Sequence, residues 1–303
     1  MSDRILVLYH ANCPDGFGAA WSFWRKYGDK AEYLAVSHGE SPPDVKGRSV
    51  YIVDFSYSRV IMEGMAKDAA SIVVLDHHKS AEKECGDLDY CIFDMNHSGA
   101  YLAWSYLFPD DNVPLLIRYI EDRDLWSWKM EHSKEVLSVI DSVEKSFEEW
   151  DKLNSELDAK ESVRFNRVRA MGEGIVSYKE TLIQSLLNNS YRTNILGYDV
   201  PIVNAPFFQS EMANHLAQGE SFAAAYYFNG NEYKFSLRST DDGEDVSEVA
   251  TMFGGGGHRN ASGFLLTDLS VLSEGITTGD KSENNERNKV KIGNKVKSNT
   301  KKA

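Results

Sequence analysis

The chain has 303 residues, a formal net charge of −13 and a hydrophobic share of 42%. This length accommodates two ordinary domains, each with its own core. No window approaches the roughly 18 consecutive apolar residues of a membrane span, and the apolar run 5–9 is too short and wrongly flanked for a signal peptide. Cys13, Cys85 and Cys91 fit no disulfide framework. We therefore expect a cytoplasmic protein without a membrane partner.

The acidic charge argues against a long nucleic acid as partner. Proteins that hold long DNA or RNA usually need a basic track, because phosphate neutralisation dominates their affinity. The basic stretch of this chain lies in 281–302, where Lys and Arg recur among Asn, Ser and Gly. Residues 271–303 have few apolar side chains to bury, so this polar, basic tail is predicted to be disordered. A small anionic substrate in a local pocket is compatible with the charge.

The first half of the chain alternates strand and helix signals. The strand signals are short apolar runs, typical of strands buried on both faces of a parallel sheet. In chain order they are the strands 5–9, 33–36, 50–53 and 71–75, with helices at 16–27 and 58–70. This alternation implies right-handed crossovers and an open parallel sheet.

The second half begins with helices and ends in another α/β unit. The pattern is mostly helical over 98–188, and 161–187 is compatible with one long helix. A strand pair at 195–204 and a short helix at 211–218 follow, then a hairpin around Asn229-Gly230. The predicted fold class is α/β: a parallel-sheet domain over 1–160, a helical connector over 161–190 and a smaller α/β domain over 191–270.

Metal-competent side chains follow three strands of the first domain. His10 ends the first, with Asp15 just beyond; Asp54 ends another, and Asp76-His77-His78 ends the last. One acidic residue after a strand is usually a turn or a helix cap. Because ligands bind at the carboxyl ends of strands in open α/β sheets, three such ends together favour a site. Asp and His without a cysteine pair suit hard or borderline divalent ions rather than structural zinc. A pair of such ions is suited to hydrolysis at phosphorus.

Two motifs resemble the DHH phosphoesterase superfamily. Asp76-His77-His78 after an apolar strand, preceded by Asp54 and by His10…Asp15-Gly16, is similar to the first domain of that family. The run 254–264, with four glycines followed by His258, resembles the GGGH loop of the associated C-terminal domain, DHHA1. Either motif alone is weak, since three letters recur by chance and a glycine run is often only a loop. Together, in this order, they extend the resemblance from Ile5 to Leu266.

The resemblance implies a role for each matching residue of the first domain. Asp54 would bridge two Mn²⁺ ions. His78 would face the scissile phosphate and stabilise developing charge, while Asp76 would orient the histidines. The implied metal ligands are His10, Asp15, Asp54, His77 and Asp122, with Asp124 as the alternative to Asp122.

In the second domain the resemblance implies phosphate recognition. Glycines let the backbone approach a phosphate and present N–H donors to it, and Arg suits bidentate phosphate binding. Arg238, at the end of the strand 233–237, resembles the substrate-binding arginine of the family, and the alternative is a solvated charge at a strand end. The implied substrate-binding residues are Arg238, Gly255, Gly256, Gly257, His258 and Arg259.

One position departs from the family pattern. Many members carry an Asp-x-Asp pair in the first motif, whereas Cys13-Pro14-Asp15 stands there in this chain. Cys13 would ligate as a thiolate and favour a softer metal, or it is a packed residue that ligates nothing. Both interpretations stay open. A similar form in a subgroup of the family argues against inactivation.

Two further features have a structural and a functional interpretation. Ser98 opens a helix whose free N–H groups would suit an anion, but a plain N-cap explains the same residue and is favoured. Tryptophans within helical segments are more often core residues than base-stacking platforms. We therefore assign these side chains to the core: Trp21, Trp24, Trp104, Trp126 and Trp128.

The resemblance implies a metal-dependent phosphodiesterase. The glycine-rich motif disfavours the family's pyrophosphatases, while the short chain and its acidic charge disfavour enzymes that digest long strands. We favour hydrolysis of a linear dinucleotide such as pGpG or pApA, or a very short oligoribonucleotide, to 5′-mononucleotides. The alternatives are a cyclic-dinucleotide phosphodiesterase, a single-strand exonuclease and a non-catalytic nucleotide sensor that has lost a metal at Cys13. The oligomeric state is open, a homodimer being one form.

Overall fold

The computed structural model describes residues 4–37, 39–158 and 163–273. The chain divides into two compact units, Met1–Ser177 and Tyr178–Ala303. From residue 274 onward the predicted tail lies outside the described residues. In the described part, no helix combines the length and the apolar character that crossing a membrane requires.

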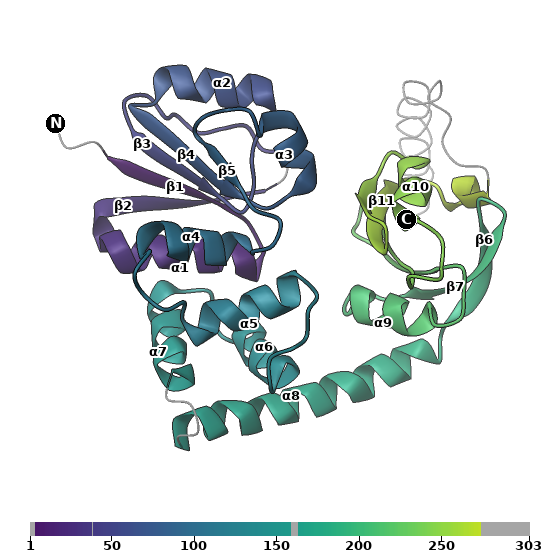
Figure 1. The fold of residues 1–303 in the computed structure, drawn as a ribbon. Helices are drawn as coiled ribbons and strands as arrows, with labels where there is room; N and C mark the ends of the chain where they lie inside the picture. Colours follow the sequence, from purple (N-terminus) through teal and green to yellow (C-terminus); the bar gives the residue numbers. More distant parts are fainter. Residues whose placement is uncertain (1–3, 38, 159–162, 274–303) are drawn as a thin grey trace, which may run out of the picture. The chain divides into compact units, whose positions relative to one another are not determined.

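The first unit is built on a five-stranded parallel sheet (Figure 1). Each apolar run of the sequence becomes a strand, and a fifth strand of three residues completes the sheet. Its spatial order is β2-β1-β3-β4-β5. The strands are β1 (Ile5–His10), β2 (Ala31–Val36), β3 (Ser49–Val53), β4 (Ser71–Asp76) and β5 (Cys91–Phe93). The predicted parallel α/β sheet is confirmed, and β5 is the strand that the sequence did not predict.

Both faces of this sheet are buried, because helices cover each of them. Successive residues of a strand point to opposite faces and therefore pack against different helices. Val7 packs with α1 (Pro14–Tyr27) and α4 (Gly99–Leu107), whereas its neighbours Leu6 and Leu8 pack with α2 (Arg59–Asp68). In Figure 1 these helices cover opposite faces. The other helices of the unit are α3 (Lys79–Cys85), α5 (Leu115–Asp124), α6 (Ser133–Ser142) and α7 (Phe147–Leu157).

The second unit carries a six-stranded sheet of order β10-β11-β9-β8-β7-β6. β7 and β8 pair in parallel and the other neighbours are antiparallel. The strands are β6 (Tyr191–Ile195), β7 (Tyr198–Asn204), β8 (Ala223–Phe228), β9 (Tyr233–Arg238), β10 (Gly256–His258) and β11 (Ala261–Leu266). The helices of this unit are α9 (Gln209–Leu216) and α10 (Val246–Thr251). The hairpin predicted around Asn229-Gly230 is confirmed as β8-β9.

The long helix predicted before this sheet is α8 (Val163–Leu187). Its last turns bury Ile183 and Leu187 against Met212 and Ala213 of α9 and Val203 of β7. The opposite face of the sheet has a core of its own, in which Phe235 stacks on Phe264. Each unit therefore buries its own apolar side chains.

The tryptophan assignment is correct for some residues and wrong for one. Trp21 and Trp104 are buried and stack on each other, with ring centroids 5.8 Å apart. Trp126 is 56% exposed and lies in a loop rather than in a helix. Its backbone φ of 54° directs the chain out of the helical path just after α5 ends, and so the ring does not face the core.

Candidate metal centre

Three neighbouring strands of the first sheet bring the candidate site together. β1, β3 and β4 lie side by side and parallel, so their carboxyl ends meet at one edge. His10 is the last residue of β1, Asp54 follows β3, and Asp76 ends β4 just before His77 and His78. Asp15 joins them from the first turn of α1. The local apolar pattern that forms each strand thus also sets the place of the polar residue behind it.

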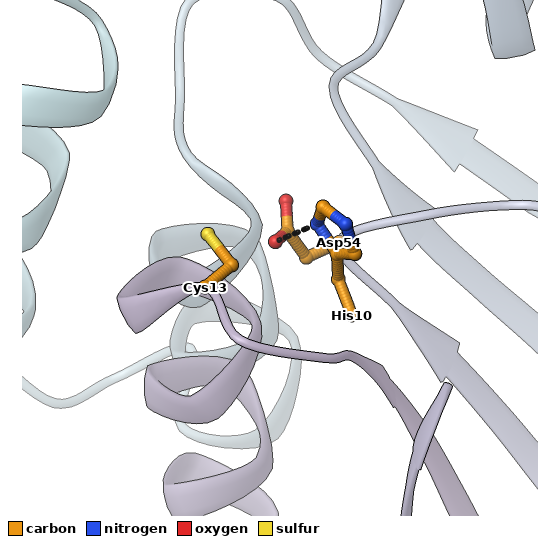
Figure 2. Close-up of side chains that lie close together, drawn as sticks. All are labelled: His10, Cys13 and Asp54. Atoms are coloured by element: carbon orange, nitrogen blue, oxygen red, sulfur yellow. Dashed lines mark ion pairs between the residues drawn. The ribbon is translucent and has the colours of Figure 1, made fainter. Parts of the chain in front are cut away.

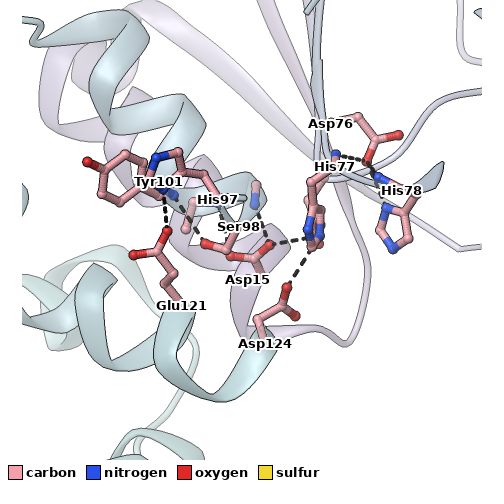
Figure 3. A network of polar contacts seen from close by, with 12 residues as sticks. Asp15, Asp76, His77, His78, His97, Ser98, Tyr101, Glu121 and Asp124 are labelled. Atoms are coloured by element: carbon pink, nitrogen blue, oxygen red, sulfur yellow. Dashed lines mark hydrogen bonds and ion pairs between the residues drawn. The ribbon is translucent and has the colours of Figure 1, made fainter. Parts of the chain in front are cut away.

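The side chains converge on Asp54. His10 Nδ1 lies 3.4 Å from Asp54 Oδ2, and His77 Nε2 lies 3.2 Å from Asp54 Oδ1. His77 Nε2 also lies 3.6 Å from Asp15 Oδ2 and 3.3 Å from Asp124 Oδ2 (Figure 3). The two oxygens of Asp54 therefore face two different groups of donors, as a carboxylate that bridges two ions would.

Among the residues that the structure describes, donor atoms gather in three overlapping groups, each within 4.8 Å. One holds Asp15, His77 and Asp124, and one holds Asp54 with both histidines of the DHH motif. The remaining group holds His10, Cys13 and Asp54 (Figure 2). The sequence left the role of Cys13 open, and the structure places its sulfur among the donors of this group.

These donors fit a cation because their own protein environment leaves them unsatisfied. Asp54 is 1% exposed, yet neither of its carboxylate oxygens has a hydrogen-bond partner in the structure. His77 Nε2 and His10 Nδ1 are likewise buried without a hydrogen bond. Burying a charged group without compensation costs several kcal/mol. Nitrogen and oxygen donors aimed at one point are what a divalent ion requires.

The pKa values show the same deficit of positive charge. Burial raises the pKa of Asp15 well above its ordinary value, and the charges of Asp54 and Asp124 raise it further. Burial also raises the pKa of Asp124. For Asp54, burial acts upward, but the rings of His10 and His77 hold the pKa below its usual range. Three acidic side chains thus compete for the positive charge of neighbouring histidines, and a divalent ion would relieve their repulsion.

Burial and the same neighbouring carboxylates also act on Cys13. Burial raises the pKa of its thiol, and the charges of Asp54 and Asp15 raise it further. The thiol is accordingly protonated unless a cation joins the site.

The start of α4 holds the site in shape. Asp15 accepts hydrogen bonds from Gly99 N at 2.6 Å and from Ala100 N at 2.9 Å. Ser98 Oγ accepts from Tyr101 N, so the predicted N-cap is confirmed. The anion at this helix end is the chain's own Asp15, whose charge the free N–H groups stabilise.

Gly99 was missed in the sequence and is required by a close approach. Asp54 adopts a left-handed φ of 63°, and a Cβ on Gly99 would lie 2.6 Å from Asp54 Cβ. Only glycine lets the first turn of α4 pass so near the strained Asp54 backbone. A glycine at the start of a helix is an ordinary sequence feature, so it carried no signal of this role.

Asp76 organises the DHH motif. It is fully buried, and its Oδ1 accepts from His77 N at 2.8 Å and from His78 N at 3.2 Å. The same oxygen lies 2.7 Å from His78 Nδ1, and this contact raises the pKa of His78 to about 9. His78 thus carries positive charge at neutral pH and presents Nε2 as its second donor.

The sequence favours Asp122 as a metal ligand, but it is the carboxylate of Asp124 that lies against His77 Nε2. Asp122 is buried and accepts from Lys129 N at 2.7 Å, Met130 N at 3.2 Å and Ser133 Oγ at 2.6 Å. Its carboxylate fixes the loop after α5. Residues two apart in a helix do not share a face, so only one of this pair faces His77. The sequence could not give the rotation of α5.

The predicted residues of the second unit have mostly protein partners. Arg238 donates to Ser210 Oγ at 2.6 Å and to Leu237 O at 2.7 Å, and burial lowers its pKa. Arg259 donates to Asp241 O and Gly243 O at 3.1 and 3.0 Å, so it supports a loop. His258 is exposed on β10 and lies in register with Ala261, which pairs on its other side with Arg238.

The last two glycines of the run belong to the strand β10, so the run is more than a loop. A Cβ on Gly255 would lie 2.1 Å from Gly263 O, and one on Gly257 would lie 2.5 Å from Ala261 O. Both glycines are therefore needed, because the run packs closely on the backbone of β11. Gly256 faces open space, with nothing within 4 Å of an added Cβ. Packing alone therefore explains two of the three glycines predicted to bind substrate, Gly255 and Gly257.

The chain is similar to proteins of one family, although no model of a known protein family matches it. It is 31% identical over 291 residues to the uncharacterized protein R106 of Acanthamoeba polyphaga mimivirus, covering 87% of this chain and 68% of that protein. It is 27% identical over 216 residues to the oligoribonuclease NrnB of Bacillus subtilis (strain 168). This second match covers 65% of the chain and about half, 53%, of NrnB.

Solved structures share the fold. The DHH domain of a member of a family of ribosomal proteins superposes with a TM-score of 0.56 at 15% identity, covering 96% of this chain and 86% of that one. The pGpG-specific phosphodiesterase PggH of Vibrio cholerae gives a TM-score of 0.50 at 14% identity, covering 96% and 99%. Fold and site define a DHH-type α/β protein with a carboxylate–histidine centre. The chain belongs to the DHH phosphoesterase family.

Proposed function

We propose that the protein is a metal-dependent phosphodiesterase that hydrolyses a linear dinucleotide or a very short oligoribonucleotide to 5′-mononucleotides. The observation that carries this proposal is the convergence of unsatisfied donors around Asp54, at the carboxyl ends of β1, β3 and β4. The names of NrnB, an oligoribonuclease, and PggH, a pGpG-specific phosphodiesterase, support a short nucleotide as substrate.

The residues of the first unit divide into ligands and phosphate-facing groups. A pair of divalent ions, with Mn²⁺ as our choice at the carboxylate-rich position, would supply an activated water and neutralise charge at the leaving oxygen. His78, held by Asp76 and positively charged, would donate a hydrogen bond to the phosphate and stabilise the charge that develops there. The side chains that would hold the ions are His10, Asp15, Asp54, His77 and Asp124.

Asp76 has a supporting role in this scheme. Its one oxygen contacts both backbone N–H groups and the ring of His78, so it sets the position of that ring before substrate arrives. A ring fixed in advance loses little entropy on binding and is aimed where charge develops.

In the second unit we assign phosphate recognition to a smaller set of groups. Arg238 retains donors beyond its two protein contacts, and the exposed His258 lies in register with it, with the strand β11 between them. The backbone N–H groups of Gly255, Gly256 and Gly257 are the third contributor to phosphate recognition in this proposal. Arg259 would act through the loop that it supports.

The test is a substrate panel with a metal series. Purified protein is incubated with 5′-phosphorylated linear dinucleotides, longer oligoribonucleotides and cyclic dinucleotides, in Mn²⁺ or with chelator, and the products are separated. We expect chelator-sensitive release of 5′-mononucleotides, fastest from dinucleotides. Processive digestion of long strands with dinucleotides untouched would contradict the proposed substrate. Binding of dinucleotide without turnover at any Mn²⁺ concentration would establish a sensor instead.

A variant pair ties the activity to this site. Asp54→Asn keeps the volume but removes the charge shared by both groups of donors, and we expect kcat/KM to fall by about 10³-fold or more, a loss of ~4 kcal/mol in transition-state stabilisation. Asp110→Asn, at an exposed turn, removes the same charge from the surface and should leave the rate unchanged. An active Asp54→Asn variant would place the chemistry elsewhere.

A further inference from the structure

Two cysteines of the first unit differ sharply in their surroundings. Cys85 is fully buried in an apolar cluster with Met62, Met65 and Val74. Cys13 is partly exposed and shares its surroundings with His10 and Asp54, whose facing atoms are 3.4 Å apart. Cys85 has the environment of a packed cysteine, and Cys13 does not.

The sulfur of Cys13 lies where a ligand would be. Its Sγ is within 4.8 Å of a ring nitrogen of His10 and of a carboxylate oxygen of Asp54 (Figure 2). The Asp54 oxygens are buried and lack hydrogen-bond partners among the described residues, so a cation at the point that these three side chains face would compensate their charge. Cys13 is also the N-cap of the 14-residue helix α1, whose N-terminal dipole favours negative charge on a side chain there.

Two of the three groups of donors have no residue in common, and these two are chemically unequal. His10, Cys13 and Asp54 offer nitrogen, sulfur and oxygen, whereas Asp15, His77 and Asp124 offer one nitrogen and two carboxylates. Thiolate sulfur favours borderline and soft ions such as Zn²⁺ and Co²⁺, and carboxylates favour hard ions such as Mn²⁺ and Mg²⁺. Asp54 belongs to the first group, and its Oδ1 lies 3.2 Å from His77 Nε2 of the second. The two positions next to Asp54 would therefore select two different ions from the same solution.

We propose that Cys13 is a thiolate ligand that makes the first metal position selective for a softer ion, while the Asp15–His77–Asp124 position takes a hard ion. The inference rests on the proposed function, since it requires that the cluster binds metal. When the ion binds, a sulfur–metal bond forms and the thiol proton leaves to solvent. The centre is then a mixed-metal site rather than one with two equivalent ions.

The experiment uses Co²⁺ as probe on the full, metal-stripped chain. Co²⁺ bound through sulfur gives a sulfur-to-cobalt charge-transfer band in the near ultraviolet, whereas its ligand-field bands in the visible report binding by any donors. We expect the charge-transfer band and the visible bands in the wild type. The same bands should appear in Cys91→Ser, a control at a partly buried cysteine in β5. In Cys13→Ser and Cys13→Asp the charge-transfer band should disappear while visible bands persist.

Metal competition gives the second readout. In Cys13→Asp, we expect the Zn²⁺ affinity of one of the two positions to fall by at least about tenfold. Mutations of residues that only support a metal ligand already lower metal affinity by about this factor. The Mn²⁺ affinity should be kept or increased. Circular dichroism of the metal-free variants verifies that each one folds.

The outcomes separate this inference from the proposed function. Visible Co²⁺ bands without a charge-transfer band in the wild type, or an unchanged band in Cys13→Ser, would overturn thiolate ligation and leave the metal centre intact. Equal Zn²⁺ affinities in wild type and Cys13→Asp would overturn the selectivity. Absence of any stoichiometric Co²⁺ binding would overturn the metal centre itself, and the inference with it.

Discussion

The DHH end of the first sheet and the glycine-rich edge of the second sheet carry the two sequence motifs, and they differ in how the fold satisfies their residues. The two oxygens of the buried Asp54 and Nε2 of His77 have no hydrogen-bond partner among the described residues. At the second sheet, Arg259 and Arg238 have protein partners and Gly255 and Gly257 are required by packing. Unsatisfied buried donors indicate a ligand directly, whereas satisfied residues of a motif need a test that separates structure from binding.

After Asp54→Asn, the largest expected effect comes from Gly99 in the first unit. Gly99→Ala would place a Cβ 2.6 Å from Asp54 Cβ, so we expect the carboxylate to be displaced, with about 100-fold lower activity and a cost of about 1–3 kcal/mol in the free energy of unfolding. Chemical denaturation and steady-state kinetics measure the two effects.

Gly64→Ala is the matched control for this change. Gly64 lies inside α2 with nothing within 4 Å of an added Cβ, so alanine should stabilise the helix by about 0.5–1 kcal/mol without affecting activity. If Gly99→Ala were as harmless as Gly64→Ala, the tight approach of α4 to Asp54 would have no functional weight.

The second comparison uses the two carboxylates of α5. Asp124→Asn should weaken metal binding by about 10–100-fold with little change in the free energy of unfolding. Asp122→Asn should do the reverse, because it weakens charge-assisted hydrogen bonds worth about 1.5–3 kcal/mol in the loop after α5. Calorimetric metal titration and urea denaturation of both variants distinguish the metal-binding role from the structural role. Loss of metal affinity in Asp122→Asn alone would restore the original assignment.

Three alanine variants test the glycine-rich strand. Gly255→Ala and Gly257→Ala should each destabilise the protein by about 1–3 kcal/mol, because the added Cβ meets the backbone of β11. Gly256→Ala should leave the free energy of unfolding within about 0.5 kcal/mol, as at an open surface site.

Gly256→Ala then isolates phosphate recognition from packing. If the backbone there approaches a phosphate, KM should rise several-fold with kcat kept, since binding alone is affected. An unchanged KM would remove Gly256 from the substrate site and make the motif a packing device.

The smallest effect concerns the charge of His78. Asp76 raises the pKa of His78 to about 9, so the stability that this pair contributes is fully present below the ordinary pKa of 6.5 and is lost as the pH rises through about 9. Asp76→Asn should return the midpoint toward 6.5. NMR titration of the metal-free protein measures both midpoints. A wild-type midpoint near 6.5 would show that Asp76 does not hold the imidazolium.

The sequence by itself determined the strands that carry the candidate site and most of the residues that converge there. Continuous apolar runs specify β1, β3 and β4, because a strand buried on both faces must be apolar at every position. The parallel arrangement then makes His10, Asp54 and His77 converge, since the carboxyl ends of neighbouring parallel strands share one edge. These inferences need only local pattern and a general rule of topology.

Tertiary structure decided what depends on rotation and close approach. Asp124 rather than Asp122 faces His77 because packing sets the rotation of α5, and residues two apart cannot share its face. The glycine run forms β10 because β11 offers it a partner, and Gly99 matters because α4 passes next to Asp54. Cys13 lies beside Asp54 because β1 and β3, which precede these two residues, are neighbouring strands. Contacts between segments distant in sequence have no local signature, so only the folded chain shows them.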